Sequence, residues 1–295
     1  MRDVLGGGVS FGVKAGGRLR RMDDLTPEHL IAGVRLREPG TRLTALRRGK
    51  VFVYGSHAST ESDIVATTGA LRWIEAEVSL RARRFCLRDQ AWYEIGDAFL
   101  REAQAVVARV ISSNPTTPMP PWPKGMVERD YNDKVSGNPG CEGFVNLDCG
   151  YVQNPFKRHN VMEVCDHLAP DDSLVLVKPA HGRSGPLSHL FNQGLVTIQL
   201  LQSSASVRAE FVRLVREQTD GRRVLPDDFV PRRVVFAIHL RRGTQLTPDS
   251  LMAFSQVTLA HTVRTLEQWG VAVEVVGIDD ADPVDDLDVH EAVAA

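Results

Sequence analysis

The stretch from Asn160 to Gly194, NVMEVCDHLAPDDSLVLVKPAHGRSGPLSHLFNQG, constrains the fold of this chain more than any other. Two short apolar segments separated by the turn APDDS predict two neighbouring strands. The glycine- and serine-containing loop HGRSG follows, and GPLSHLFNQG then places apolar residues at helical spacing. A chain with this order builds a sheet that carries a helix on one face.

The segments around this stretch extend the same pattern. From Met126 onward we expect helix, strand, strand, strand, helix, helix, strand, helix and strand. RVVFAIHL is a nearly continuous apolar run, which is typical of a strand covered on both faces. We therefore predict an α/β (α+β) fold with a mixed sheet and flanking helices, in a core domain over residues 125–280.

The remaining segments define the predicted domain organisation. Residues 1–24 are rich in glycine and predict an unstructured, ragged start, and residues 25–113 predict a small α+β module. Residues 114–124 hold five prolines and predict a stiff linker between the two domains. Residues 281–295 are acidic and predict a solvated tail.

Composition narrows the classes of function. The net charge is −2 and the pI about 6.5, so the chain as a whole has no basic field for nucleic acid. The four cysteines form no C-x-x-C motif, which excludes the common zinc folds and indicates reduced thiols. No run of about 18 apolar residues predicts a membrane span. We expect a soluble, cytoplasmic protein without a membrane partner.

Carboxylates and a lysine follow the predicted core strands and resemble the centre of a restriction-endonuclease-like, metal-dependent nuclease. In that class acids on neighbouring strands hold Mg²⁺ or Mn²⁺, and a lysine assists hydrolysis. The resemblance implies Asp166 and Asp148 as metal ligands and nucleic acid as partner. The full predicted catalytic set is Glu128, Asp148, Glu163, Asp166 and Lys178.

Two details qualify this set. The nuclease pattern places a carboxylate two positions before the lysine, and this chain has Leu176 there. Glu163 and Asp166 are three residues apart, so in a regular strand they point to opposite faces. Asp166, near the strand end, is then the better candidate.

A second candidate site is an anion site at the start of the helix after HGRSG. Free amides at a helix start and nearby cations suit a phosphate group, although the spacing excludes a nucleotide-triphosphate P-loop. Two alternatives stay open. The polar residues could simply cap the start of the helix, and His189 could be a hydrogen-bonded residue of the core. A Cys165–His189 thiol and base pair is a further alternative. The predicted binding residues are Arg183, Ser184, Ser188, His189 and Gln193, beside Lys178.

Several segments together resemble a family of unknown function, domain-of-unknown-function family 6119, whose members are sporadically distributed. They include MEVCD (Met162 to Asp166), LVLVK (Leu174 to Lys178) and GPLSHLFNQG (Gly185 to Gly194). The resemblance extends from about Leu25 to about Ile278 and implies a C-terminal portion or an N-terminally truncated member. Members usually carry a histidine at the position of Leu176.

Three hypotheses about function follow. The first is a nuclease-like, nucleic-acid-acting protein of a mobile-element, defence or toxin type. The second is a non-catalytic interaction module or an inactive, truncated remnant, in which the SHLFNQG helix and the MEVCD strand only pack a core. A phosphate-ligand protein that uses HGRSG is a third, weaker hypothesis.

Overall fold

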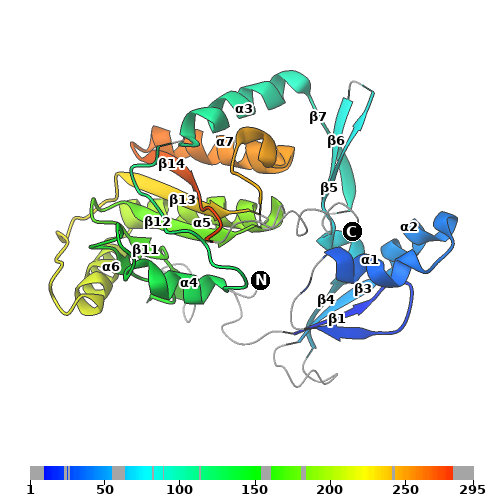
Figure 1. Cartoon of the computed structure of the whole chain (residues 1–295), viewed down its shortest axis with the longest axis horizontal. Helices are drawn as coiled ribbons and strands as arrows, with labels where there is room; N and C mark the ends of the chain where they lie inside the picture. The colour runs from blue at the N-terminus through cyan, green and yellow to red at the C-terminus, as the bar shows by residue number, and fades with distance from the viewer. Residues whose placement is uncertain are drawn as a thin grey trace. The chain divides into compact units, whose positions relative to one another are not determined.

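The computed structural model divides into two compact units, Met1–Gly96 and Asp97–Ala295, and Figure 1 shows their elements. The structure describes residues 10–22, 25, 27–54, 64–81, 83–88, 90–112, 114–153, 161–180, 184–240 and 243–281.

The first unit contains two antiparallel sheets. The four-stranded sheet has the order β2-β1-β3-β4 and packs against α1, and the other is the meander β5-β6-β7. The bounds are β1 Ser10–Lys14, β2 Arg20–Met22, α1 Pro27–Arg35, α2 Pro39–Arg48, β3 Lys50–Tyr54, β4 Ile64–Gly69, the 3₁₀ turn η2 Ala70–Trp73, β5 Ala76–Leu80, β6 Arg83–Arg88 and β7 Ala91–Ile95.

The expectation of an unstructured start was wrong for residues 10–22. Phe11 and Val13 alternate with small or polar residues, and both side chains are buried in the core of the first unit. Their strand β1 pairs with β2 on one side and β3 on the other. The period-2 pattern of β1 is only five residues long, and the surrounding glycines leave too few side chains to make it visible in the sequence.

The second unit is built on a five-stranded mixed sheet of order β14-β13-β12-β11-β8. The strands β12, β13 and β14 are parallel, and β11 is antiparallel to both of its neighbours. The bounds are α3 Asp97–Val110, α4 Glu128–Val135, β8 Val145–Asn146, β9 Tyr151–Gln153, β10 Val161–Glu163, β11 His167–Leu168, β12 Leu174–Pro179, α5 Ser184–Ser203, α6 Ala205–Gln218, β13 Arg233–His239, the 3₁₀ turn η3 Pro248–Ser250, α7 Ala253–Gln268 and β14 Ala272–Gly277.

Helices cover both faces of this sheet, which explains the apolar runs in β12 and β13. Leu174 and Leu176 of β12 belong to the larger core cluster, with residues of α3, α5, α6 and α7. Val175 and Val177 belong to a second cluster, with Tyr131 of α4. Successive residues of a strand point to opposite faces, so each strand needs apolar side chains throughout. The predicted mixed sheet with flanking helices is confirmed, and the restriction-endonuclease-like core stays a prediction.

The division between the units lies before α3, earlier than the predicted linker at 114–124. Helix α3 packs on α7, and Ile111 forms a β-bridge with Val275 of β14. The proline-rich segment also belongs to the second unit: the Trp122 amide donates to the Asp279 carbonyl at 2.7 Å, and its side chain is buried. Proline excludes regular structure here without excluding packing.

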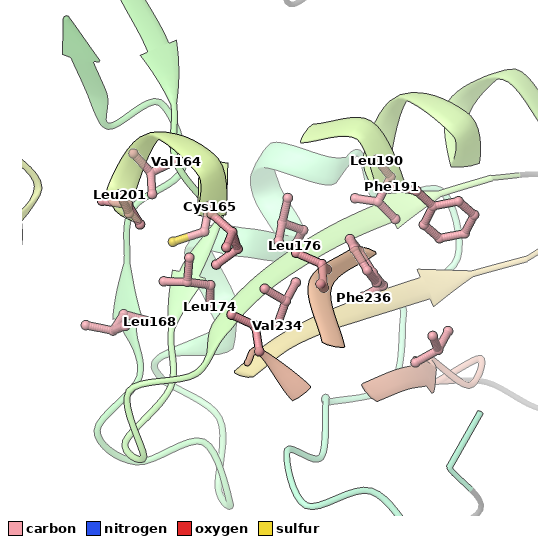
Figure 2. Packing of buried hydrophobic residues seen from close by; sticks show 14 of the residues in the cluster. Val164, Cys165, Leu168, Leu174, Leu176, Leu190, Phe191, Leu201, Val234 and Phe236 are labelled. Atoms are coloured by element: carbon pink, nitrogen blue, oxygen red, sulfur yellow. The ribbon is translucent and has the colours of Figure 1, made fainter. Parts of the chain in front are cut away.

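The segment SHLFNQG in α5 forms a packing surface. Leu187, Leu190 and Phe191 are buried, and Phe191 meets Phe236 of β13 edge-to-face at 5.2 Å between ring centroids. Figure 2 shows Leu190, Phe191, Leu176 and Phe236 in one cluster. Helix α5 and strand β13 approach each other closely at Gly194, because this residue has no side chain.

We expect Gly194→Ala to lower the free energy of unfolding by about 2 kcal/mol, since overpacking a tight core costs about 1–3 kcal/mol. A Cβ at Gly194 would lie 2.7 Å from Cζ of Phe236, a fully buried ring with no room to move. The matched control is Gly40→Ala in α2, where a Cβ meets nothing within 4 Å. Urea unfolding of both variants checks the prediction, and equal stabilities would contradict it.

No helix in the described part of the chain is long and apolar enough to cross a membrane.

Candidate functional site

Asp166 lies between β10 and β11, and its side chain supplies a hydrogen-bond acceptor to the backbone of β12. Its Oδ2 accepts from the Val177 amide at 2.7 Å, and its Oδ1 accepts from Nδ2 of Asn132 at 3.4 Å. The side chain is buried, at 5% exposure. Both carboxylate oxygens therefore serve internal donors. The predicted catalytic and metal-binding role of Asp166 stays a prediction, and these contacts already explain why the residue is acidic.

The break in the strand also changes the relation between Glu163 and Asp166. The predicted single strand is wrong: β10 ends at Glu163 and pairs with β9, whereas β11 begins at His167 and pairs with β12. Two residues without strand geometry separate the two carboxylates in the chain. Strand alternation therefore does not place the two side chains on opposite faces.

Glu163 lies beside the turn that links β8 to β9. Its Oε1 accepts from the Cys149 amide at 2.6 Å, and the Cys149 thiol is 3.7 Å from Oδ1 of Asp148. The ligand atoms of Asp148, Cys149 and Glu163 all lie within 4.8 Å of one another. We call these three residues the acidic cluster. It unites two predicted site residues, Asp148 and Glu163, with a cysteine that the sequence analysis did not select.

Cys149 holds an unusual backbone conformation in this turn. Its φ is 60°, in the left-handed region, which costs roughly 1–2 kcal/mol for a residue with a Cβ. The turn is closed by the Gly150 amide, which donates to the Leu147 carbonyl at 2.8 Å. The Asp148 amide donates to Oδ1 of Asn146 at 2.9 Å. Such strain at an exposed thiol beside two carboxylates suggests a role for the side chain itself.

Replacing Cys149 by glycine should raise the free energy of unfolding by about 1 kcal/mol, because glycine adopts φ near 60° without a steric cost. The amide that orients Glu163 is kept. Thermal or urea unfolding measures the effect, and Cys149→Ala, which keeps the strain, is the control. A glycine variant no more stable than the alanine variant would contradict this account of the turn.

Lys178, at the end of β12, forms an ion pair with Glu128, the first residue of α4. Its Nζ lies 2.8 and 3.0 Å from the two carboxylate oxygens of Glu128, and both side chains are partly buried. A carboxylate at a helix start also interacts favourably with the helix dipole. The structure thus joins the predicted Glu128 and Lys178 directly.

The electrostatics connect the ion pair with the acidic cluster through Asp166. Burial raises the pKa of Asp166 well above its usual range, the carboxylates of Glu163 and Glu128 raise it further, and Lys178 acts against them. Glu128, Glu163 and Lys178 therefore all act on Asp166, and Asp148 lies with Glu163 in the acidic cluster. The excess of carboxylates favours bound cations or protons.

The thiol and phenol beside Asp148 show the same excess of negative charge. Partial burial, followed by the charge of Asp148, raises the pKa of Cys149. Partial burial raises the pKa of Tyr151 to about 12, with Cys149 the next contribution. Cys149 is therefore a protonated thiol at neutral pH, and a thiolate nucleophile is not favoured in this state.

Leu176 lies inside the larger core cluster and is fully buried (Figure 2). A carboxylate at this position would face Leu190 and Phe191 instead of a solvated metal site. The departure from the nuclease pattern at residue 176 is therefore compatible with the packing, and the acidic cluster lies elsewhere.

The predicted anion site is only partly described. Arg183 and the side chain of Ser184 lie outside the described residues. Ser188 is buried, Gln193 is half-buried, and His189 is exposed on the side of α5 away from the core. A core position for His189 was therefore wrong. The Cys165–His189 pair gains no support, because Cys165 is fully buried and burial raises its pKa well above normal.

A further polar group at the carboxyl ends of the parallel strands was missed by the sequence analysis. Nε2 of His239, the last residue of β13, lies 3.0 Å from Oδ1 of Asp280. The ring of Trp122 stacks between those of His239 and Tyr131, with centroids 4.9 and 4.1 Å away. Ligands commonly bind at this edge of parallel sheets. The available signal was the polar residue ending a buried strand.

The chain belongs to a family of unknown function, DUF6119, whose family model matches residues 6–279. The match covers both structural units and confirms the resemblance inferred from the sequence. No curated protein and no solved structure matches the chain.

Proposed function

We propose that this protein is a divalent-metal-dependent phosphodiester hydrolase that acts on nucleic acid. The observation that carries the proposal is the convergence of Asp148, Cys149 and Glu163, whose ligand atoms lie within 4.8 Å of one another. In the proposal, Asp148 and Glu163 hold the metal ion. Asp166, which the sequence favoured as a ligand, would position the segment that carries Glu163.

The donor set fits a divalent cation. Carboxylate oxygens are the usual ligands of Mg²⁺ and Mn²⁺, and the Cys149 amide keeps one oxygen of Glu163 fixed at 2.6 Å. The adjacent thiol adds a softer donor, which favours Mn²⁺ or Zn²⁺ over Mg²⁺. A metal bound here would neutralise charge on a phosphate and lower the pKa of a bound water.

Lys178 and Glu163 both act electrostatically on Asp166, and a cation in this position suits an anionic substrate. The ammonium group of Lys178 is held by Glu128 at the sheet edge, where it would contact a phosphate oxygen. Glu128 would keep the lysine oriented. The four cysteines are free thiols, which supports a reducing, cytoplasmic setting. A defence or toxin context rests on the family resemblance alone.

The alternative function is a non-catalytic interaction module. It is favoured by Asp166, because both carboxylate oxygens of this residue accept from internal donors. In this alternative the acidic residues hold the sheet and its turns together, and no turnover occurs.

Cleavage assays distinguish the two functions. We expect the full chain to cut single- or double-stranded DNA or RNA in the presence of Mn²⁺ or Mg²⁺ and to lose activity in EDTA. Glu163→Gln and Asp148→Asn should each lower the rate by about 100-fold or more, since ligand loss removes most metal-dependent catalysis. The matched control is Glu142→Gln, which changes an exposed carboxylate outside the acidic cluster. A folded wild-type protein that cuts none of these substrates would support the interaction module.

A further inference from the structure

The first unit contains two adjoining cavities lined by basic residues. The larger, of about 690 Å³, is lined by Lys14, Arg37, Arg48 and Lys50. The second, of about 500 Å³, is lined by Arg18 and Arg20 and again by Arg37. Gly16 and Gly17 also line both cavities, so the two cavities adjoin. We call the two together the basic groove, after their cations Lys14, Arg18, Arg20, Arg37, Arg48 and Lys50.

Among the lining residues that the structure describes, neither cavity has an aspartate or a glutamate. Within the described residues, none of the six cations forms an ion pair with a carboxylate. Residues 1–96 contain sixteen Lys and Arg against eleven Asp and Glu, a net charge of +5, and residues 97–295 contain nineteen against twenty-six, a net −7. The near-neutral total therefore conceals a basic first unit.

Two of the cations are placed against each other. Lys14 ends β1 and Lys50 begins β3, and they are directly opposite in the antiparallel register. Like charges in this position destabilise a sheet. No carboxylate in the described lining of the cavity offsets them, so a bound anion would relieve the repulsion.

The backbone around the groove is also suited to an anion. Nε of Arg37, a residue that lines both cavities, donates to the Gly16 carbonyl at 2.7 Å, which orients the guanidinium. Gly40 and Thr41, in the first turn of α2, line the larger cavity. Amides at a helix start carry a partial positive charge. Helix α2 buries none of its side chains, so its basic residues are not needed for the core.

We infer that the basic groove binds the phosphate backbone of a nucleic-acid strand. Six cations spread over two cavities exceed what one phosphate group requires and suit successive phosphates. Phe52 lines the larger cavity and offers a ring on which a base can stack. The groove belongs to the first unit, so this inference does not depend on hydrolysis by the second.

Binding of fluorescent single-stranded DNA and RNA to the full chain tests the inference by anisotropy, in EDTA so that no cleavage occurs. If all six cations contact phosphates, the logarithm of affinity should fall with that of salt concentration with a slope of about −4, roughly 300-fold between 50 and 200 mM. Lys50→Gln and Arg48→Gln should each weaken binding about tenfold and reduce the slope by about 1. Lys50→Gln should leave the melting temperature unchanged or raise it, since it removes the repulsion from Lys14.

The matched control is Arg47→Gln, which removes the same charge from the neighbouring position of α2 but lines neither cavity. If Arg47→Gln and Arg48→Gln reduced the affinity equally, binding would not depend on the basic groove, and the inference would be wrong. If millimolar inorganic phosphate fully displaced the strand, the groove would be a site for a single phosphate group and the inference of a nucleic-acid strand would be wrong. If no strand bound at low salt, both interpretations of the groove would be wrong. Retained binding in a Glu163→Gln variant that does not cleave would separate this inference from the proposed hydrolysis.

Discussion

Replacing Asp166 by alanine should lower the free energy of unfolding by about 3 kcal/mol or more. The change leaves the Val177 amide, which donates to Asp166 at 2.7 Å, without an acceptor inside the sheet. It also removes the acceptor of the fully buried Asn132 side chain. A buried donor left unsatisfied costs about 1–3 kcal/mol, and two are affected. Chemical denaturation measures the difference.

Asp166→Asn is the informative companion variant. Burial and nearby carboxylates raise the pKa of Asp166, so the folded state favours a neutral side chain there. The amide keeps the shape and the acceptor for Val177 but places a donor opposite Nδ2 of Asn132, so we expect a loss of about 1–2 kcal/mol, less than in the alanine variant. An asparagine variant as unstable as the alanine variant would show that the folded protein requires the charge. The alanine variant is thus a poor test of metal binding, because it also damages the sheet.

The pH dependence of stability should reveal the titration of His167, the buried residue that follows Asp166. Burial lowers the pKa of His167 to about 4, whereas an unfolded histidine titrates near 6.5. Between about pH 6.5 and about pH 4 the unfolded chain therefore binds a proton on this histidine that the folded chain does not bind. The free energy of unfolding falls as the pH falls from about 6.5 to about 4. The full loss from this group is about 3 kcal/mol.

Asp166 opposes this effect in the wild type. Its raised pKa makes the folded state bind a proton that the unfolded carboxylate lacks, so its contribution to stability grows as the pH falls toward 3.8. Asp166→Asn removes that contribution, and this variant should lose about 3 kcal/mol between pH 6.5 and 4. The double variant with His167→Gln should lose far less. Equal slopes for the two variants in urea titrations at several pH values would contradict the assignment to His167.

The sequence predicted most elements of the second unit because their signals are local. The apolar run in β13 and the helical spacing in α5 and α7 each identify one element without knowledge of the others. The strand β12 and the turn before it were found in the same way. The hairpin β1–β2 was missed, because glycines in a short segment leave too few side chains to show a pattern.

The site was predicted less completely because its contacts connect distant residues. The sequence suggested Asp148 and Glu163, but their approach depends on the left-handed turn at Cys149, which only the backbone reveals. Likewise, nothing near Asp166 in the sequence indicates that Val177 and Asn132 occupy its oxygens. Trp122 was assigned to a linker, whereas it stacks with His239, more than a hundred residues later.

The most direct test of the central claim is calorimetric titration of Mn²⁺, with Mg²⁺ and Zn²⁺ in parallel, into the wild type, Glu163→Gln and Glu142→Gln. We expect one site in the wild type and in Glu142→Gln, and at least tenfold weaker binding in Glu163→Gln, because the variant loses one of two carboxylate ligands. Absence of binding by the folded wild type, or equal binding by all three proteins, would contradict a metal site at Asp148 and Glu163.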